Sequence, residues 1–125
     1  MFAFSFGHGS FNYPVSEQFI ILVIAPKAEY ASPDNFLEKT FAFLNTDAEF
    51  RDNWDEIYQA HICTPASDSD IAEIRERFEA MNEKISVLHA PFLSALHITP
   101  PQWNEVIMRL ETASEYIFYL WGTTA

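Results

Sequence analysis

The sequence predicts one α+β domain over residues 1–125, in which a small N-terminal antiparallel sheet is packed by about four amphipathic helices. Three observations predict this class. Apolar residues alternate with small ones near the N-terminus, and beyond residue 32 they recur every three to four positions. A chain of 125 residues with 49% hydrophobic content is also long enough to bury one core without disulfides or metal.

The strand signals lie in the first third of the chain. Phe2, Phe4 and Phe6 alternate with small residues, which is the period-two pattern of a strand. The run 17–25 is β-branched and apolar on both faces, as is typical of a central strand that is covered on both sides, and Pro26 ends it. We expect these segments to form a small antiparallel sheet.

Two helices are expected next. Ser32, Pro33 and Asp34 stand in the favoured order of an N-cap, a first-turn proline and a first-turn acid. Apolar residues follow at helical spacing as far as Leu44. A capping-box pattern at 46–49 predicts the start of a second helix. Its expected inner face consists of Phe50, Trp54, Ile57 and Tyr58, with His61 as a further candidate.

The clearest helical periodicity of the chain lies in residues 71–88, after a loop at 65–70. The positions that share its apolar face are Ile71, Ile74, Phe78, Met81, Ile85 and Leu88. A second capping-box pattern, at 99–102, predicts a fourth helix that ends at Gly122. Its apolar positions are Trp103, Val106, Ile107, Leu110, Ala113, Ile117, Leu120 and Trp121.

Two short segments, 61–64 and 95–98, stay ambiguous between strand and loop. If both are strands, the fold is an α/β sandwich, and this alternative stays open at the sequence level.

Composition excludes several classes of protein. A single cysteine rules out a paired disulfide scaffold, and no basic segment precedes the N-terminal apolar residues as it would in a signal peptide. The longest apolar run has seven residues, far fewer than the roughly 20 that span a bilayer. We therefore expect a cytoplasmic protein. With only seven lysines and arginines, direct binding to nucleic acid or to an anionic membrane is not expected.

Acidic residues are concentrated in one part of the chain. Between Asp47 and Glu83 there are eleven acidic and three basic residues, a net charge of −8 in a chain of −11. A solvent-exposed helix face explains one acidic stripe, but such faces usually carry both positive and negative side chains. Each pair of like charges three or four residues apart destabilises a helix by about 0.2–0.5 kcal/mol. We therefore predict a partner-binding surface made of Glu49, Asp52, Asp55, Glu56, Asp68, Asp70, Glu76, Glu79 and Glu83.

The soft metal ligands are Cys63 and four histidines. His61 and Cys63 are close in sequence, but a zinc site needs three or four ligands and no second pair at finger spacing exists, so we expect no metal and no cofactor. The tripeptide His97-Ile98-Thr99 resembles one half of the paired H-x-[ST] signature of two-histidine phosphoesterases, which implies an acid–base role for His97. The candidate second half has Cys63 where a hydroxyl belongs.

The charge pattern favours a non-enzymatic acidic inhibitor of the immunity-protein kind, which binds and blocks a basic, nucleic-acid-handling protein such as a nuclease toxin or a phage-defence nuclease. Aromatic anchors are expected at the centre of such an interface, and the candidates are Tyr58, Tyr116, Tyr119 and Trp121. Two alternatives stay open. One is an adaptor that oligomerises, for example as a homodimer, through exposed aromatic residues. The other is a small enzyme that uses His61 or His97.

Overall fold

A computed structural model describes residues 1–7, 10–11, 17–46, 54–79 and 90–124. Its centre is a six-stranded sheet of order β1-β2-β6-β5-β4-β3, in which every neighbouring pair is antiparallel. The strands are β1 (Phe2–Phe6), β2 (Gln18–Pro26), β3 (Thr64–Pro65), β4 (Ser94–His97), β5 (Glu105–Glu111) and β6 (Glu115–Thr123).

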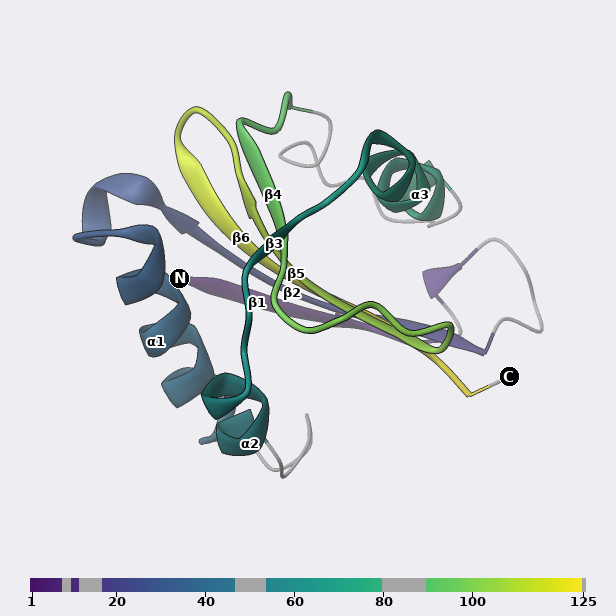
Figure 1. Ribbon diagram of the computed structural model, residues 1–125, viewed down its shortest axis with the longest axis horizontal. Helices are drawn as coiled ribbons and strands as arrows, with labels where there is room; N and C mark the ends of the chain where they lie inside the picture. Colours follow the sequence, from purple (N-terminus) through teal and green to yellow (C-terminus); the bar gives the residue numbers. More distant parts are fainter. Residues whose placement is uncertain (8–9, 12–16, 47–53, 80–89, 125) are drawn as a thin grey trace.

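Helices lie on both faces of this sheet (Figure 1). A short 3-10 helix, η2 (Lys27–Glu29), leads from β2 toward α1 (Pro33–Leu44), and α2 (Trp54–Gln59) follows on the same face. The chain then crosses the β3 edge, and α3 (Asp68–Glu79) lies on the opposite face. We call the two sides the α1/α2 face and the α3 face.

Aromatic packing fills the α1/α2 face. Ser32 caps α1, because its Oγ accepts a hydrogen bond of 3.0 Å from the Asn35 backbone N–H. The apolar side of α1 and Trp54 of α2 then meet the alternate inward residues of β2 and β6. Phe41, Trp54 and Phe118 contact one another edge to face, with ring centroids 5.6–5.9 Å apart.

On the α3 face the described residues include one α-helix. It contributes two buried apolar side chains, Ile74 and Phe78. They pack on Leu22, Met108 and Tyr119, which belong to the three central strands. The strands are therefore apolar on both sides, as the run 17–25 indicated, since each face has a helical cover.

The predicted fourth helix is wrong. The residues after Trp103 form the β5–β6 hairpin, paired from Glu105↔Gly122 to Glu111↔Tyr116. Thr112 makes the turn, because its Oγ1 accepts from the Glu115 backbone N–H at 3.0 Å. Central strands that are buried on both faces are apolar at nearly every position. Such a run contains apolar residues at every third or fourth position, which mimics a helix, although the side chains alternate between two faces.

The expected architecture is wrong for the same reason. The sheet is neither small nor N-terminal, and three α-helices rather than about four pack it in the described part of the chain. The broad α+β class holds. The ambiguous segment 95–98 largely forms β4, whereas of the segment 61–64 only Thr64 belongs to a strand, β3. The sheet is wholly antiparallel.

The other predicted elements lie where the patterns indicated. The structure confirms strands at 2–6 and 18–26 and the helix from Pro33 to Leu44. Helix α3 begins at Asp68, within the expected loop. Phe50 of the second predicted helix and Met81, Ile85 and Leu88 of the third lie outside the described residues. None of the described helices is long and apolar enough to span a membrane.

Candidate acidic surface

The carboxylates predicted to bind a partner are divided between two faces of the molecule. Asp55 and Glu56 are exposed on α2, whereas Asp68, Glu76 and Glu79 are exposed on α3. Because α2 and α3 cover opposite sides of the sheet, these groups do not form one continuous surface. The remaining candidates on the two helical segments, Glu49, Asp52 and Glu83, lie outside the described residues.

On α3 the exposed carboxylates form a regular row. Glu73, Glu76 and Glu79 follow one another at i, i+3 and i+6 and are all exposed. We call them the α3 acidic stripe. Glu73 was not among the predicted residues, although its spacing of three from Glu76 was a sufficient signal.

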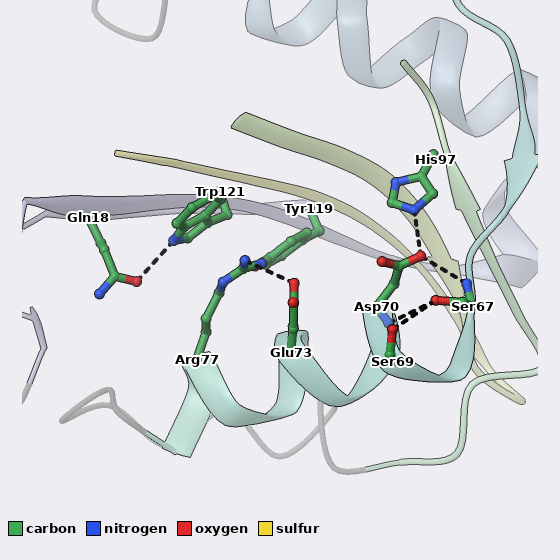
Figure 2. A network of polar contacts seen from close by, with 9 residues as sticks. All are labelled: Gln18, Ser67, Ser69, Asp70, Glu73, Arg77, His97, Tyr119 and Trp121. Atoms are coloured by element: carbon green, nitrogen blue, oxygen red, sulfur yellow. Dashed lines mark hydrogen bonds and ion pairs between the residues drawn. The ribbon is translucent and has the colours of Figure 1, made fainter. Parts of the chain in front are cut away.

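Among the predicted carboxylates that the structure describes, Asp70 turns toward the sheet. Its Oδ2 lies 3.0 Å from His97 Nε2 on β4 and accepts a hydrogen bond of 2.9 Å from the Ser67 backbone N–H (Figure 2). Ser67 Oγ in turn accepts from the Asp70 N–H at 3.1 Å, so the two residues form a reciprocal cap at the start of α3.

The same contacts control the ionisation of Asp70. The His97 hydrogen bond, followed by the Ser67 backbone bond, lowers the pKa of Asp70 from 3.8 to about 2. Both contacts favour the carboxylate over the neutral acid. Asp70 therefore ties α3 to the sheet, and the exposed acidic surface depends on the other carboxylates.

The positive charges that could neutralise α3 are folded inward. Arg77 places its guanidinium 3.8 Å from the ring centroid of Trp121, and its Nη1 donates to the Tyr119 hydroxyl at 3.2 Å (Figure 2). Arg75 stacks 4.5 Å from the Phe92 ring centroid and donates to a backbone carbonyl. Arg77 also contacts Glu73, with its Nη2 3.4 Å from Glu73 Oε2.

Arg77 and its neighbours form a polar network on the α3 face. Burial raises the pKa of Tyr119 to about 12, although the nearby Arg77 opposes this shift, so the hydroxyl stays protonated. Trp121 donates from its indole nitrogen to Gln18 Oε1 at 3.0 Å. These contacts join α3 to β6 and β2 through side chains rather than through a wide apolar seam.

Two further cations, Lys27 and Arg109, pair with Glu111 at the end of β5. Lys27 Nζ lies 2.8 Å from Glu111 Oε2, and it also donates to the Thr112 carbonyl at 3.3 Å. Arg109 is only 7% exposed, with its Nη1 3.7 Å from the other oxygen of Glu111. Both cations therefore pair with the same carboxylate, that of Glu111.

The aromatic residues expected to anchor a partner are mostly internal. Tyr116, Tyr119 and Trp121 are buried in β6, and Tyr58 is half-buried against Phe41. The prediction that these three β6 residues form an exposed interface is wrong, because it assumed a helix with one outward side. In a central strand both sides face a core.

The histidines and Cys63 do not assemble into a metal site where the chain is described, since no three metal-ligand side chains gather there. Cys63 is exposed, and His61 pairs through Nδ1 with the Tyr58 carbonyl. His97 is buried, and Thr64 rather than a second histidine lies opposite it on β3. The Ile62 N–H donates to the Ile98 carbonyl at 2.7 Å, so the two tripeptide segments lie side by side. Their histidines have different partners, since His97 contacts Asp70 of α3 and His61 contacts Tyr58.

Comparison with known proteins places the chain in no family: no family model, curated protein or solved structure matches it.

Proposed function

We propose that this protein is a small acidic inhibitor that binds a basic, nucleic-acid-handling protein and covers its nucleic-acid site. A nuclease toxin or a phage-defence nuclease has the required chemistry. The proposal includes a cytoplasmic location, no catalytic step, no cofactor and no direct contact with nucleic acid or membrane. One observation supports it: exposed carboxylates follow one another along α3 at Glu73, Glu76 and Glu79, while both arginines of that helix stack on aromatic rings.

The α3 acidic stripe is the surface that best fits this role. Neighbouring carboxylates at helical spacing lie about 5–6 Å apart, which is similar to successive phosphates along a nucleic-acid strand. A site that binds phosphates would meet Glu73, Glu76 and Glu79 as a comparable row of charge. Helix α2 offers a shorter surface, because it has six residues against twelve in α3.

Electrostatics would act mainly on the rate of association. A chain of net charge −11 attracts a basic partner over about a Debye length, which is roughly 8 Å at physiological salt. Such steering raises the association rate and makes it strongly dependent on salt. Both properties can be measured without knowing the geometry of the complex.

The experiment begins with capture of partners on the immobilised protein from source lysate at low salt, with elution at high salt. Each captured protein is then purified and assayed for nucleic-acid binding or cleavage with and without this protein. We expect inhibition of at least one basic protein. Stopped-flow association is measured next for Glu76→Lys with Glu79→Lys, and we expect a rate at least about tenfold lower with a flatter salt dependence.

The matched control is Glu29→Lys with Glu38→Lys, two exposed residues on η2 and α1. It changes the net charge by the same amount on the opposite side of the sheet. It should slow association much less than the α3 pair. Equal slowing by both variants would point to total charge alone, and unchanged rates would reject the acidic-inhibitor function.

A further inference from the structure

The two edges of the sheet differ in a way that concerns assembly. At the β3 edge the strand has only two residues, one of which is Pro65, which lacks an N–H. At the other edge β1 has five residues, and no strand pairs with its outer side in the described part of the chain. An edge of this kind presents unsatisfied backbone donors and acceptors.

Residues 1–7 lack the usual protection of such an edge. They contain no proline and no ionisable side chain, although the whole chain carries 25 charged ones. Phe2 and Phe4 are also 66% and 41% exposed, while Phe6 is buried beside Ile20 and Leu22. Among the described residues the apolar α3 face therefore continues outward along β1 as an exposed surface, which another strand would complete.

The sequence of β1 matches itself in the antiparallel direction. If two copies pair about a two-fold axis at Phe4, Phe2 lies opposite Phe6 of the second copy and Ala3 lies opposite Ser5. Large side chains then face large ones on the α3 face, and small face small on the other. Phe4 and Phe6 already stack within one chain, with ring centroids 6.2 Å apart, so the second copy would extend an existing row of rings.

The distribution of charge also favours the β1 edge as the site of contact between two copies. Two copies of net charge −11 repel each other wherever their carboxylates meet. The α3 acidic stripe lies on a helix that is set over the central strands, whereas β1 contains no ionisable side chain. Pairing of two copies along β1 therefore brings no carboxylates of this strand against each other.

We propose that β1 is a self-association edge, through which two copies join antiparallel into one continuous sheet of twelve strands. This inference does not depend on the proposed inhibitor function. Stable interfaces bury roughly 1,200–2,000 Å² of surface. A pair of five-residue strands buries less surface than this, so we expect the dimer to be weak and dependent on concentration.

The test is sedimentation velocity of the full chain over a wide concentration range. The weight-average sedimentation coefficient of the wild type should rise toward that of a dimer. Phe4→Lys and Phe4→Glu should each weaken dimerisation by at least about tenfold, because like charges would face each other at the two-fold axis. Mixing the two variants in equal amounts should restore the dimer, since lysine then faces glutamate.

Phe43→Lys is the matched control, because Phe43 on α1 is 40% exposed, nearly the same as Phe4. It should dimerise like the wild type. Circular dichroism checks that each variant folds. If Phe4→Lys does not fold, Phe2→Lys replaces it, because Phe2 is more exposed than Phe4. The proposal is overturned by a wild type that stays monomeric throughout, by a mixture that does not recover, or by equal loss in Phe43→Lys.

Discussion

The two faces of the sheet are stabilised by different means. On the α1/α2 face, large apolar side chains from two helices meet the sheet, and Phe36, Phe41 and Trp54 are almost completely buried. On the α3 face, within the described part of the chain, helix α3 contributes Ile74 and Phe78, and polar or cation–π contacts of Asp70 and Arg77 add to its attachment. Burial of apolar area on the first face is non-directional and cooperative. The second face depends on a few specific contacts, which charge and pH can alter.

This difference matters because the proposed partner surface is on the helix that specific polar and cation–π contacts attach to the sheet. Its outer side carries the α3 acidic stripe, and its inner side carries the contacts that hold it. We therefore expect the amides of α3 to exchange with solvent faster than those of β2 and β6. The following changes test the comparison, from the largest effect to the smallest.

Trp54→Ala should have the largest effect, a loss of about 4–5 kcal/mol in the free energy of unfolding. Trp54 is fully buried and its ring contacts both Phe41 and Phe118, so truncation would leave a large cavity between α1, α2 and β6. Chemical denaturation followed by far-ultraviolet circular dichroism measures it. A loss below about 2 kcal/mol would mean that the α1/α2 face is not the main stabilising core.

Phe78→Ala should cost less, about 3 kcal/mol, because Phe78 lies on the α3 face and meets one ring, that of Tyr119, at 5.8 Å. Hydrogen exchange should show lost protection in α3 before loss in the central strands. If Phe78→Ala destabilises the protein more than Trp54→Ala does, the ranking of the two faces is reversed.

The Asp70–His97 contact predicts a specific pH dependence. The pKa of Asp70 is lowered on folding from 3.8 to about 2, so its contribution to stability is complete above about pH 4 and is lost as the pH falls toward 2. Asp70→Asn should reduce stability by about 1 kcal/mol at neutral pH, through the weakened cap and the lost charge-assisted bond.

The measurement is a set of urea denaturation curves of both proteins between pH 2 and pH 7. The wild type and Asp70→Asn should converge as the pH falls through that window. Parallel curves with a constant separation would show that Asp70 is not the titrating group that attaches α3.

Arg77→Lys should have the smallest effect, about 1 kcal/mol. Lysine keeps the charge but loses the planar stack on Trp121 and the directed bond to Tyr119. Lys39→Ala, at an exposed position on α1, is the control and should change stability by less than about 0.5 kcal/mol. If the two substitutions cost the same, the inward arginine does not hold α3.

Local signals were enough to identify several elements from the sequence. The cap at Ser32, the alternation at 2–6 and the apolar run at 17–25 each act within a few residues, and the structure has α1, β1 and β2 there. The spacing of Glu76 and Glu79 likewise placed them on the outer side of a helix. Such features need only the backbone geometry of one segment.

Tertiary structure decided what those signals left open. The residues after Trp103 became a buried hairpin because helices cover both faces of the sheet, and only that double cover explains strands that are apolar throughout. Packing also determines that Asp70 contacts His97 and that Arg77 stacks on Trp121. It places α2 and α3 on opposite faces of the sheet. The sequence alone determined how many charges the chain has. Long-range packing determined which of them face solvent, because the partners of a side chain lie many residues away.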